Sequence, residues 1–164
     1  MSAAETIKNL GDYINGEFQQ PEGEDGHWVI KSPANLRDIV YEGVFYYDNI
    51  DKACLAAKAA FHPWAKLGLE KRIEYMNRLK EVYQTNTDKL ATTISRETGK
   101  PFWEAKTEVV AMIGKISITI DHSLKLVADE KIENIQAHTD GWIRFKPRGV
   151  MAVLGPFNFP GHLP

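Results

Sequence analysis

The 164-residue chain has a single cysteine, Cys54, and therefore forms no intramolecular disulfide, which agrees with a reducing compartment. It also lacks any apolar run near the roughly 20 residues that span a bilayer. Its first residues do not combine a basic region with an apolar core, so they predict no secretory signal. We therefore expect a cytoplasmic protein with no membrane partner.

Charge of one sign is not in excess, because 20 basic side chains stand against 22 acidic ones and leave a net charge of -2. Nucleic acids and anionic membranes favour a basic partner, so neither is expected to bind. The five histidines and Cys54 show no metal-ligand spacing, and we expect no metal. Complete catalytic signatures such as GxGxxG, GxxxxGK[ST], GxSxG and HExxH are also missing.

The sequence does contain an ordered succession of strand and helix patterns. With 43% hydrophobic residues the chain is long enough for one ordinary core. Strand and turn patterns fill residues 1–47, and Asn15-Gly16 predicts a hairpin turn. Apolar spacing then predicts four helices: one capped by Asp48 or Asn49 and ended by His62-Pro63, one over 69–83, one holding Leu90 and Ile94 and closed by Gly99, and one from Pro101 to Ile120. A hairpin turning at 139–141 and a buried-type strand at 150–154 complete the order.

Asn158 is the sharpest candidate for chemistry, because it follows the carboxyl end of the predicted strand 150–154. Ligands bind at such ends in open α/β sheets. A carboxamide there can donate a hydrogen bond to an oxygen that gains negative charge. The alternative is that Asn158 caps a turn or the start of a helix. His162 lies near it and could face a ligand, although an ordinary loop histidine explains it as well.

Structural roles explain the other conspicuous residues. Cys54 lies on the apolar stripe of the first helix, which predicts a buried and unreactive thiol. The segment ETGKP (97–101) is explained by a helix stop followed by a proline restart. Glu104 and Glu108 are expected on the solvated face of the last helix, where Lys100 would form a weak surface pair with Glu104.

Five segments together resemble the N-terminal part of the aldehyde dehydrogenase superfamily, in the order found in that family. They are YINGEF (13–18), SPANLRDIV (32–40), AAKAAFHPWAKL (56–67), ETGKPFWEAKTEV (97–109) and PRGVMAVLGPFNFP (147–160). The ending NFPGHLP, together with KPFWEAKTEVVAMIGKI, is most similar to members that oxidise succinylglutamate semialdehyde with NAD in arginine catabolism.

The resemblance implies an α/β fold, namely the N-terminal part of an aldehyde dehydrogenase fold, incomplete. Residues 1–131 would hold the N-terminal strands and helices of the cofactor-binding domain. Residues 132–147 would form an oligomerisation-type β-hairpin. Residues 148–164 would supply the first strand of a Rossmann-like cofactor domain and the NFP loop. A homo-oligomer is the implied assembly.

In the family a cysteine thiolate attacks the aldehyde, hydride passes to the nicotinamide, and a glutamate-activated water hydrolyses the thioester. The resemblance implies that the Asn158 side chain, with a main-chain N–H, holds the developing oxyanion. It implies that Leu154, Gly155, Pro156 and Phe157 line the floor of the NAD cleft. The nucleophile, the glutamate base, the ribose-binding lysine and the glycine turn would all lie beyond residue 164.

We therefore expect an N-terminal fragment of an NAD-dependent aldehyde dehydrogenase that binds NAD weakly or not at all and is inactive alone. One alternative is a non-catalytic interaction module. It would pair with a separate C-terminal half or an intact relative through its hairpin and the unpaired edge of strand 150–154. A further alternative is a self-contained α+β binding domain.

Overall fold

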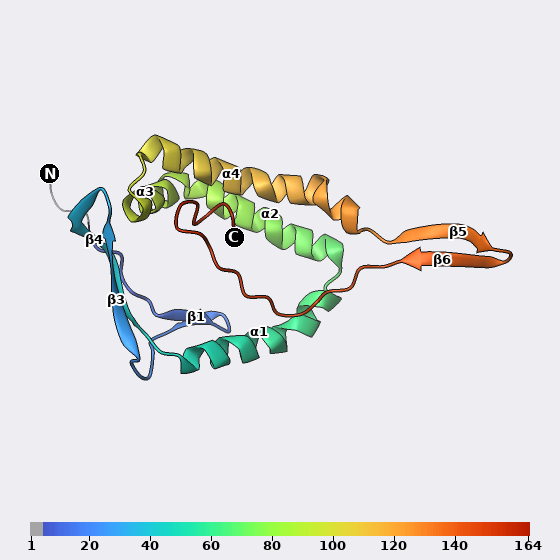
Figure 1. Ribbon diagram of the computed structural model, residues 1–164, viewed down its shortest axis with the longest axis horizontal. Coiled ribbons are helices and arrows are strands. Elements are labelled where there is room, and N and C mark those ends of the chain that lie inside the picture. Colours follow the sequence, from blue (N-terminus) through green and yellow to red (C-terminus); the bar gives the residue numbers. More distant parts are fainter. Residues whose placement is uncertain (1–4) are drawn as a thin grey trace.

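The computed structural model describes residues 5–164, and its strands pair as three separate antiparallel hairpins (Figure 1). The strands are β1 (Asp12–Ile14) with β2 (Glu17–Gln19), β3 (Gly26–Ser32) with β4 (Asn35–Phe45), and β5 (Glu130–Gln136) with β6 (Thr139–Ile143). The β5–β6 hairpin projects away from the helices, and nearly all of its residues are exposed.

Four α-helices lie between the second and third hairpins: α1 (Asp48–Lys66), α2 (Leu69–Thr85), α3 (Thr87–Thr98) and α4 (Phe102–Asp121). A short 3-10 helix, η1 (Ser123–Val127), follows α4. In Figure 1, α2, α3 and α4 form a bundle, whereas α1 diverges from it. The chain after β6 returns past α1 and ends against α2 and α4.

Two turns have positive φ angles, and each is occupied by a residue type that tolerates them. Asn15 and Gly16 connect β1 to β2 with φ of 55° and 88°, as the Asn-Gly pair predicts. Gly99 ends α3 in the left-handed region at φ 76°, and Pro101 precedes the first turn of α4. Both predictions from the sequence are confirmed.

The buried core lies between α3 and α4 and is small. Its centre consists of Ala91 and Ile94 from α3 with Ala105, Val109 and Met112 from α4. These positions repeat every three to four residues on each helix, so they share one face. The apolar stripe predicted on α4 is therefore confirmed at its centre, while Phe102 at its start remains 45% exposed.

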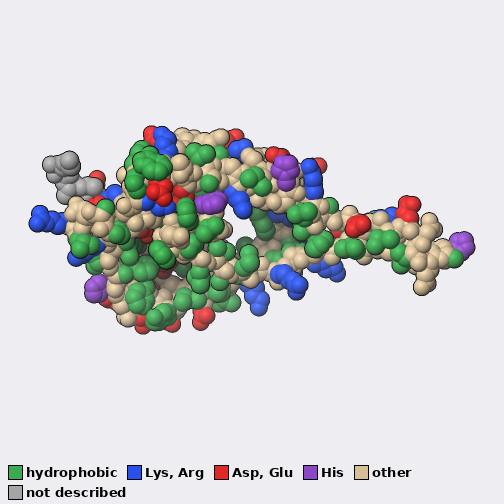
Figure 2. All heavy atoms as spheres, turned by 45° about the horizontal axis from the view of Figure 1, so that its top comes forward, with side chains coloured by type: hydrophobic (Ala, Val, Ile, Leu, Met, Phe, Trp, Pro, Cys, Tyr) green, Lys and Arg blue, Asp and Glu red, His purple; other side chains and the backbone are tan. Residues whose placement is uncertain are grey.

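Most other apolar side chains are exposed. The accessible surface is 12716 Å², about one and a half times the roughly 8,200 Å² that a compact monomer of 18.6 kDa exposes. Figure 2 shows hydrophobic side chains spread over much of the visible face. A chain with this much apolar surface is not a self-contained globule in the ordinary sense.

Helix α1 departs from its prediction at both ends. Tyr47 is the N-cap and makes no side-chain capping bond, and the Asn49 amide donates to Asp12 instead, at 2.7 Å. The helix also runs through Pro63 and ends at Lys66. A proline removes one intrahelical hydrogen bond. The carbonyl that loses this donor belongs to an exposed stretch of α1, where water can donate a hydrogen bond to it.

Two further predictions near the C-terminus are wrong. The third hairpin turns at Ala137-His138 rather than at 139–141, since Gln136 pairs with Thr139 and Asp140 sits inside β6. Residues 150–154 do not form a strand, because within the described residues no other strand runs beside them to supply hydrogen bonds. They follow an extended, exposed path.

A bidentate ion pair ties the second hairpin to the helix bundle. The Arg96 guanidinium on α3 donates to both carboxylate oxygens of Asp38 on β4, at 2.7 and 3.0 Å. It also donates to the main-chain carbonyls of Glu5 and Ile39. The hydrogen bonds from Arg96 hold the pKa of Asp38 below its ordinary value.

This pair predicts an acid-dependent contribution to stability. A carboxyl group whose pKa is lower in the folded chain than in the unfolded chain stabilises the fold at pH values above its pKa in the unfolded chain. This stabilisation is lost as the pH falls through its pKa in the folded chain. We expect Asp38→Asn to lower the free energy of unfolding at pH 7, and the difference from the wild type to shrink below about pH 4. Urea unfolding followed by tryptophan fluorescence at several pH values measures it.

The matched control is Glu42→Gln, because Glu42 is an exposed carboxylate on the same strand that makes no ion pair among the described residues. Its stability should run parallel to that of the wild type at every pH. A constant difference between Asp38→Asn and the wild type from pH 7 to pH 2 would contradict the prediction.

Candidate functional site

Asn158 lies in a bend that has no regular secondary structure. Its side chain is exposed, and within residues 5–164 the hydrogen bond that Asn158 makes uses its main chain rather than its carboxamide. Its main-chain carbonyl accepts a hydrogen bond of 2.7 Å from the Lys100 ammonium. The turn-capping role is therefore not seen, and the amide of Asn158 is free to meet a ligand.

A buried ion pair holds the loop that carries Asn158. Lys100 lies between α3 and α4, and its Nζ is 2.8 Å from Oε2 of Glu108 on α4. The two side chains are 10% and 1% exposed. The other carboxylate oxygen of Glu108 accepts the main-chain N–H groups of Gly161 and His162, at 2.9 and 3.3 Å. We call Lys100 and Glu108, with these loop contacts, the loop anchor.

The loop approaches α4 closely at Gly161. A Cβ added to this glycine would lie 2.7 Å from the Met112 sulfur, which is too close for any real side chain. Gly161, His162 and Pro164 then line a hollow of about 230 Å³ between α2 and α4. The end of the described chain is thus packed against the helix bundle.

These contacts correct the surface roles expected from the sequence. Glu108 is buried rather than solvated, and Lys100 pairs with Glu108 and not with Glu104. The segment 97–101 does more than stop one helix and start the next, since it places Lys100 under the loop. The spacing of Glu108 from Ala105 and Met112 places it on the buried face of α4, but it does not identify the loop that covers it, which is some fifty residues away in sequence.

The residues expected to form the cofactor floor make no closed cleft. Leu154 and Phe157 are 93% and 91% exposed. Gly155 lies close to Pro160, whose carbonyl oxygen would be 3.3 Å from an added Cβ. Residues 154–157 therefore form an open apolar edge. They offer surface for stacking, but within the described chain they present no phosphate-binding cradle to a dinucleotide.

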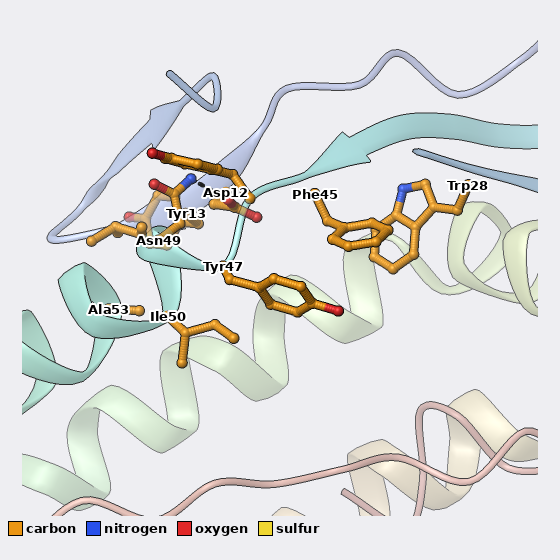
Figure 3. A pocket seen from close by; sticks show the side chains of 10 residues that line it. Asp12, Tyr13, Trp28, Phe45, Tyr47, Asn49, Ile50 and Ala53 are labelled. Atoms are coloured by element: carbon orange, nitrogen blue, oxygen red, sulfur yellow. Dashed lines mark hydrogen bonds between the residues drawn. The ribbon is translucent and has the colours of Figure 1, made fainter. Parts of the chain in front are cut away.

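A larger hollow of about 570 Å³ lies elsewhere, between the first two hairpins and α1 (Figure 3). Trp28, Phe45 and Tyr47 line it, and their rings pack edge-on or tilted against one another. Its one carboxylate at the first hairpin, that of Asp12, accepts the Asn49 amide. It contains none of the residues that the sequence predicts for the site.

Cys54 is exposed on α1, so its predicted burial is wrong. The apolar stripe that suggested burial has no partner, since α1 touches the rest of the described chain mainly at β1. No group of three or more potential metal ligands occurs in the part of the chain that the structure describes. No helix there is long and apolar enough to cross a membrane.

The arrangement thus presents one chemically useful group, a free carboxamide on a loop that a buried ion pair fixes. A carboxamide N–H can stabilise a developing oxyanion. It has no titratable proton near neutral pH, so it does not act as an acid or base. Any nucleophile or base that works beside it must approach Asn158 from its open side.

The family model for the aldehyde dehydrogenase family matches residues 23–164, and the chain belongs to this family. An N-succinylglutamate 5-semialdehyde dehydrogenase of Chromobacterium violaceum is 49% identical over 154 residues, which are 93% of this chain and 30% of that protein. A Legionella pneumophila protein of the same name is 38% identical over 99% of this chain and 32% of its own length. The chain spans about a third of the length of these relatives.

Solved structures of the family have the same fold over about a third of their own length. Methylmalonate-semialdehyde dehydrogenase of Oceanimonas doudoroffii superposes with a TM-score of 0.82 at 27% identity, over 98% of this chain and 32% of that one. A putative methylmalonate-semialdehyde dehydrogenase of Sinorhizobium meliloti, complexed with NAD, gives 0.79 at 26% identity, over 92% and 30%. The α/β fold expected from the sequence is confirmed.

The exposure of Cys54 makes a direct prediction. An accessible thiol reacts with a disulfide reagent at nearly the same rate in the folded chain as in the unfolded chain. We expect one thiol per chain to react with Ellman's reagent in buffer, at nearly the rate found in denaturant. Ala57→Cys in a Cys54→Ser chain is the control, since residue 57 is also exposed on α1. A thiol that is silent until the chain unfolds would contradict the exposed position.

Proposed function

We propose that these residues supply the N-terminal part of an NAD-dependent aldehyde dehydrogenase that oxidises succinylglutamate semialdehyde to succinylglutamate in arginine catabolism, in the cytoplasm. The two relatives named for this substrate, one of them 49% identical, support the substrate. The free carboxamide of Asn158 on its anchored loop is the observation that carries the chemistry.

Asn158 acts as an oxyanion donor in this proposal. When a thiolate attacks the aldehyde carbonyl, the carbonyl oxygen gains negative charge, and the Asn158 side-chain N–H donates to it. A donor that is fixed beforehand pays no reorganisation cost when the charge develops. The nucleophile and the base are contributed by sequence outside the described residues.

NAD would meet this part of the protein at residues 154–157. The exposed side chains of Leu154 and Phe157 can form one apolar wall against a flat ring. They do not by themselves fit a whole dinucleotide, because this edge of the described chain is open and has no groups for the phosphates. We therefore expect weak or no NAD binding by the 164-residue chain. The projecting β5–β6 hairpin is the surface we propose for contact with a second subunit.

Activity should appear only when the missing groups are supplied. We expect purified chain with NAD and succinylglutamate semialdehyde to give no rise in reduced-nicotinamide absorbance. Joined to the remainder of the Chromobacterium violaceum relative, the same chain should turn over the aldehyde. In that chimera Asn158→Ala should lower kcat by about a hundredfold to a thousandfold, the usual effect of losing an oxyanion donor.

Asn77→Ala is the matched control, since Asn77 is exposed on α2 and does not line the hollow that the loop enters, and it should leave kcat unchanged. Sustained turnover by the 164-residue chain, free of contaminating enzyme, would show that the active site is complete without further sequence. An Asn158→Ala chimera with full kcat would remove Asn158 from the mechanism.

A second candidate function is a non-catalytic interaction module, which the large exposed apolar surface favours. The surface includes the open side of α1 and the path of residues 150–154. In this proposal a separate polypeptide equivalent to the remainder of the enzyme, or an intact relative, covers that surface. Burying apolar area would drive the association.

Co-expression distinguishes the two candidates. We expect the tagged chain to elute together with an untagged C-terminal remainder of the Chromobacterium violaceum relative on size-exclusion chromatography. If the complex forms and also oxidises the aldehyde, the chain is a catalytic half. If it forms without activity, the interaction module is favoured, and two separate peaks would count against both forms of pairing.

A further inference from the structure

We infer that Lys100 and Glu108 are positioning residues whose ion pair fixes the main chain at Asn158 and just after it, and so aims the Asn158 carboxamide. The inference rests on the proposed role of Asn158 as an oxyanion donor. Neither residue reaches the reacting atoms in this proposal. They act through the loop that carries the donor.

The first support is where the anchor holds the loop. Lys100 donates to the carbonyl of Asn158 itself, at 2.7 Å, and its ammonium lies 4.4 Å from the ring centre of Phe159. Glu108 accepts the N–H groups of Gly161 and His162. Every one of these contacts to Asn158, Gly161 and His162 uses main chain, so the Asn158 side chain remains free for a ligand.

The second support is the burial of the charges. Glu108 is the one charged residue that is fully buried within residues 5–164, and it receives three hydrogen bonds from Lys100 and the loop. An isolated buried carboxylate is strongly disfavoured. The loop therefore completes the solvation of Glu108, and Glu108 in turn orders the loop. A glutamate exposed to water would not need the loop, and a loop on the open surface would not be ordered by a buried charge.

The third support is that the main chain around Lys100 is itself held. Its carbonyl accepts the Ser95 hydroxyl at 2.7 Å, and its N–H donates to the Thr98 hydroxyl at 3.3 Å. Gly99 and Pro101 on either side fix the turn between α3 and α4. The anchor thus connects the loop to the best-packed part of the described chain.

Hydrogen exchange on the 164-residue chain tests the anchoring directly. We expect Lys100→Met and Glu108→Gln to speed exchange of the Gly161 and His162 amides on the order of tenfold to a hundredfold, as loss of charge-assisted bonds implies. Exchange in the middle of α4 should stay slow, which shows that the helix remains folded.

Two variants on the same helix are matched controls. Lys106→Met removes a lysine whose pair with Asp88 is exposed, and Glu104→Gln removes a carboxylate one turn from Glu108. Both should leave the Gly161 and His162 amides protected as in the wild type. Unchanged exchange in Lys100→Met and Glu108→Gln, with α4 intact, would overturn the inference. If Glu108→Gln disrupts α4, Lys100→Met alone decides the outcome.

Kinetics of the chimera test whether the anchoring matters for the donor. We expect Lys100→Met to lower kcat on the order of tenfold to a hundredfold while KM for the aldehyde stays within about twofold. In an Asn158→Ala background, Lys100→Met should lower kcat little further, because it acts through Asn158. A merely structural role would lower the activity of both backgrounds by the same factor.

The outcomes separate this inference from the proposed function. If Asn158→Ala lowers kcat but Lys100→Met does not, or if the two effects simply multiply, the positioning role is wrong and the proposed donor stands. If Asn158→Ala leaves kcat unchanged, the proposed donor fails and the positioning role fails with it. Lys100→Arg, which keeps the charge, should recover part of the lost kcat if the inference is right.

Discussion

The carboxylate of Glu108 lies where the helix bundle and the C-terminal loop meet, and both depend on how it is satisfied. One oxygen faces the Lys100 ammonium and the other faces two main-chain N–H groups of the loop. A buried ion pair is weak grounds for stability, because desolvation offsets much of the attraction, but removing one partner of such a pair costs about 3–5 kcal/mol. The need to satisfy the buried Glu108 carboxylate therefore restricts where the Gly161 and His162 N–H groups of the loop can lie.

The second constraint is the shortage of buried apolar surface. The core between α3 and α4 is well packed, whereas α1, the hairpins and the extended path of residues 150–154 leave their apolar sides exposed. Polar contacts consequently hold several segments that are distant in sequence in place. The Arg96–Asp38 pair links a hairpin to α3, and the loop anchor links the C-terminal loop to α4. Both connect to the same small core.

Local features of this chain could be predicted from sequence, and features that need a distant partner could not. The turn at Asn15-Gly16 and the end of α3 at Gly99 follow from backbone preferences of single residues. Burial of Cys54 was wrong because periodicity marks an apolar face without saying what covers it. The strand at 150–154 failed for a related reason, since a strand needs a neighbour. The role of Asn158 was predicted from its motif and stays a prediction. The burial of Glu108 was missed because its charge favoured solvent, although its spacing from Ala105 and Met112 places it on the buried face of α4.

Glu108 explains how the proposed donor, Asn158, can be held by so small a part of a fold. An oxyanion donor is useful only if its position is fixed before the charge develops, and a bend without regular structure does not fix itself. Here the α3–α4 turn, the α4 helix and the loop anchor hold the loop, and the absence of a side chain at Gly161 lets the loop reach Met112. All three lie within the residues described. The aim of the Asn158 carboxamide is thus set within this chain, whatever polypeptide supplies the nucleophile.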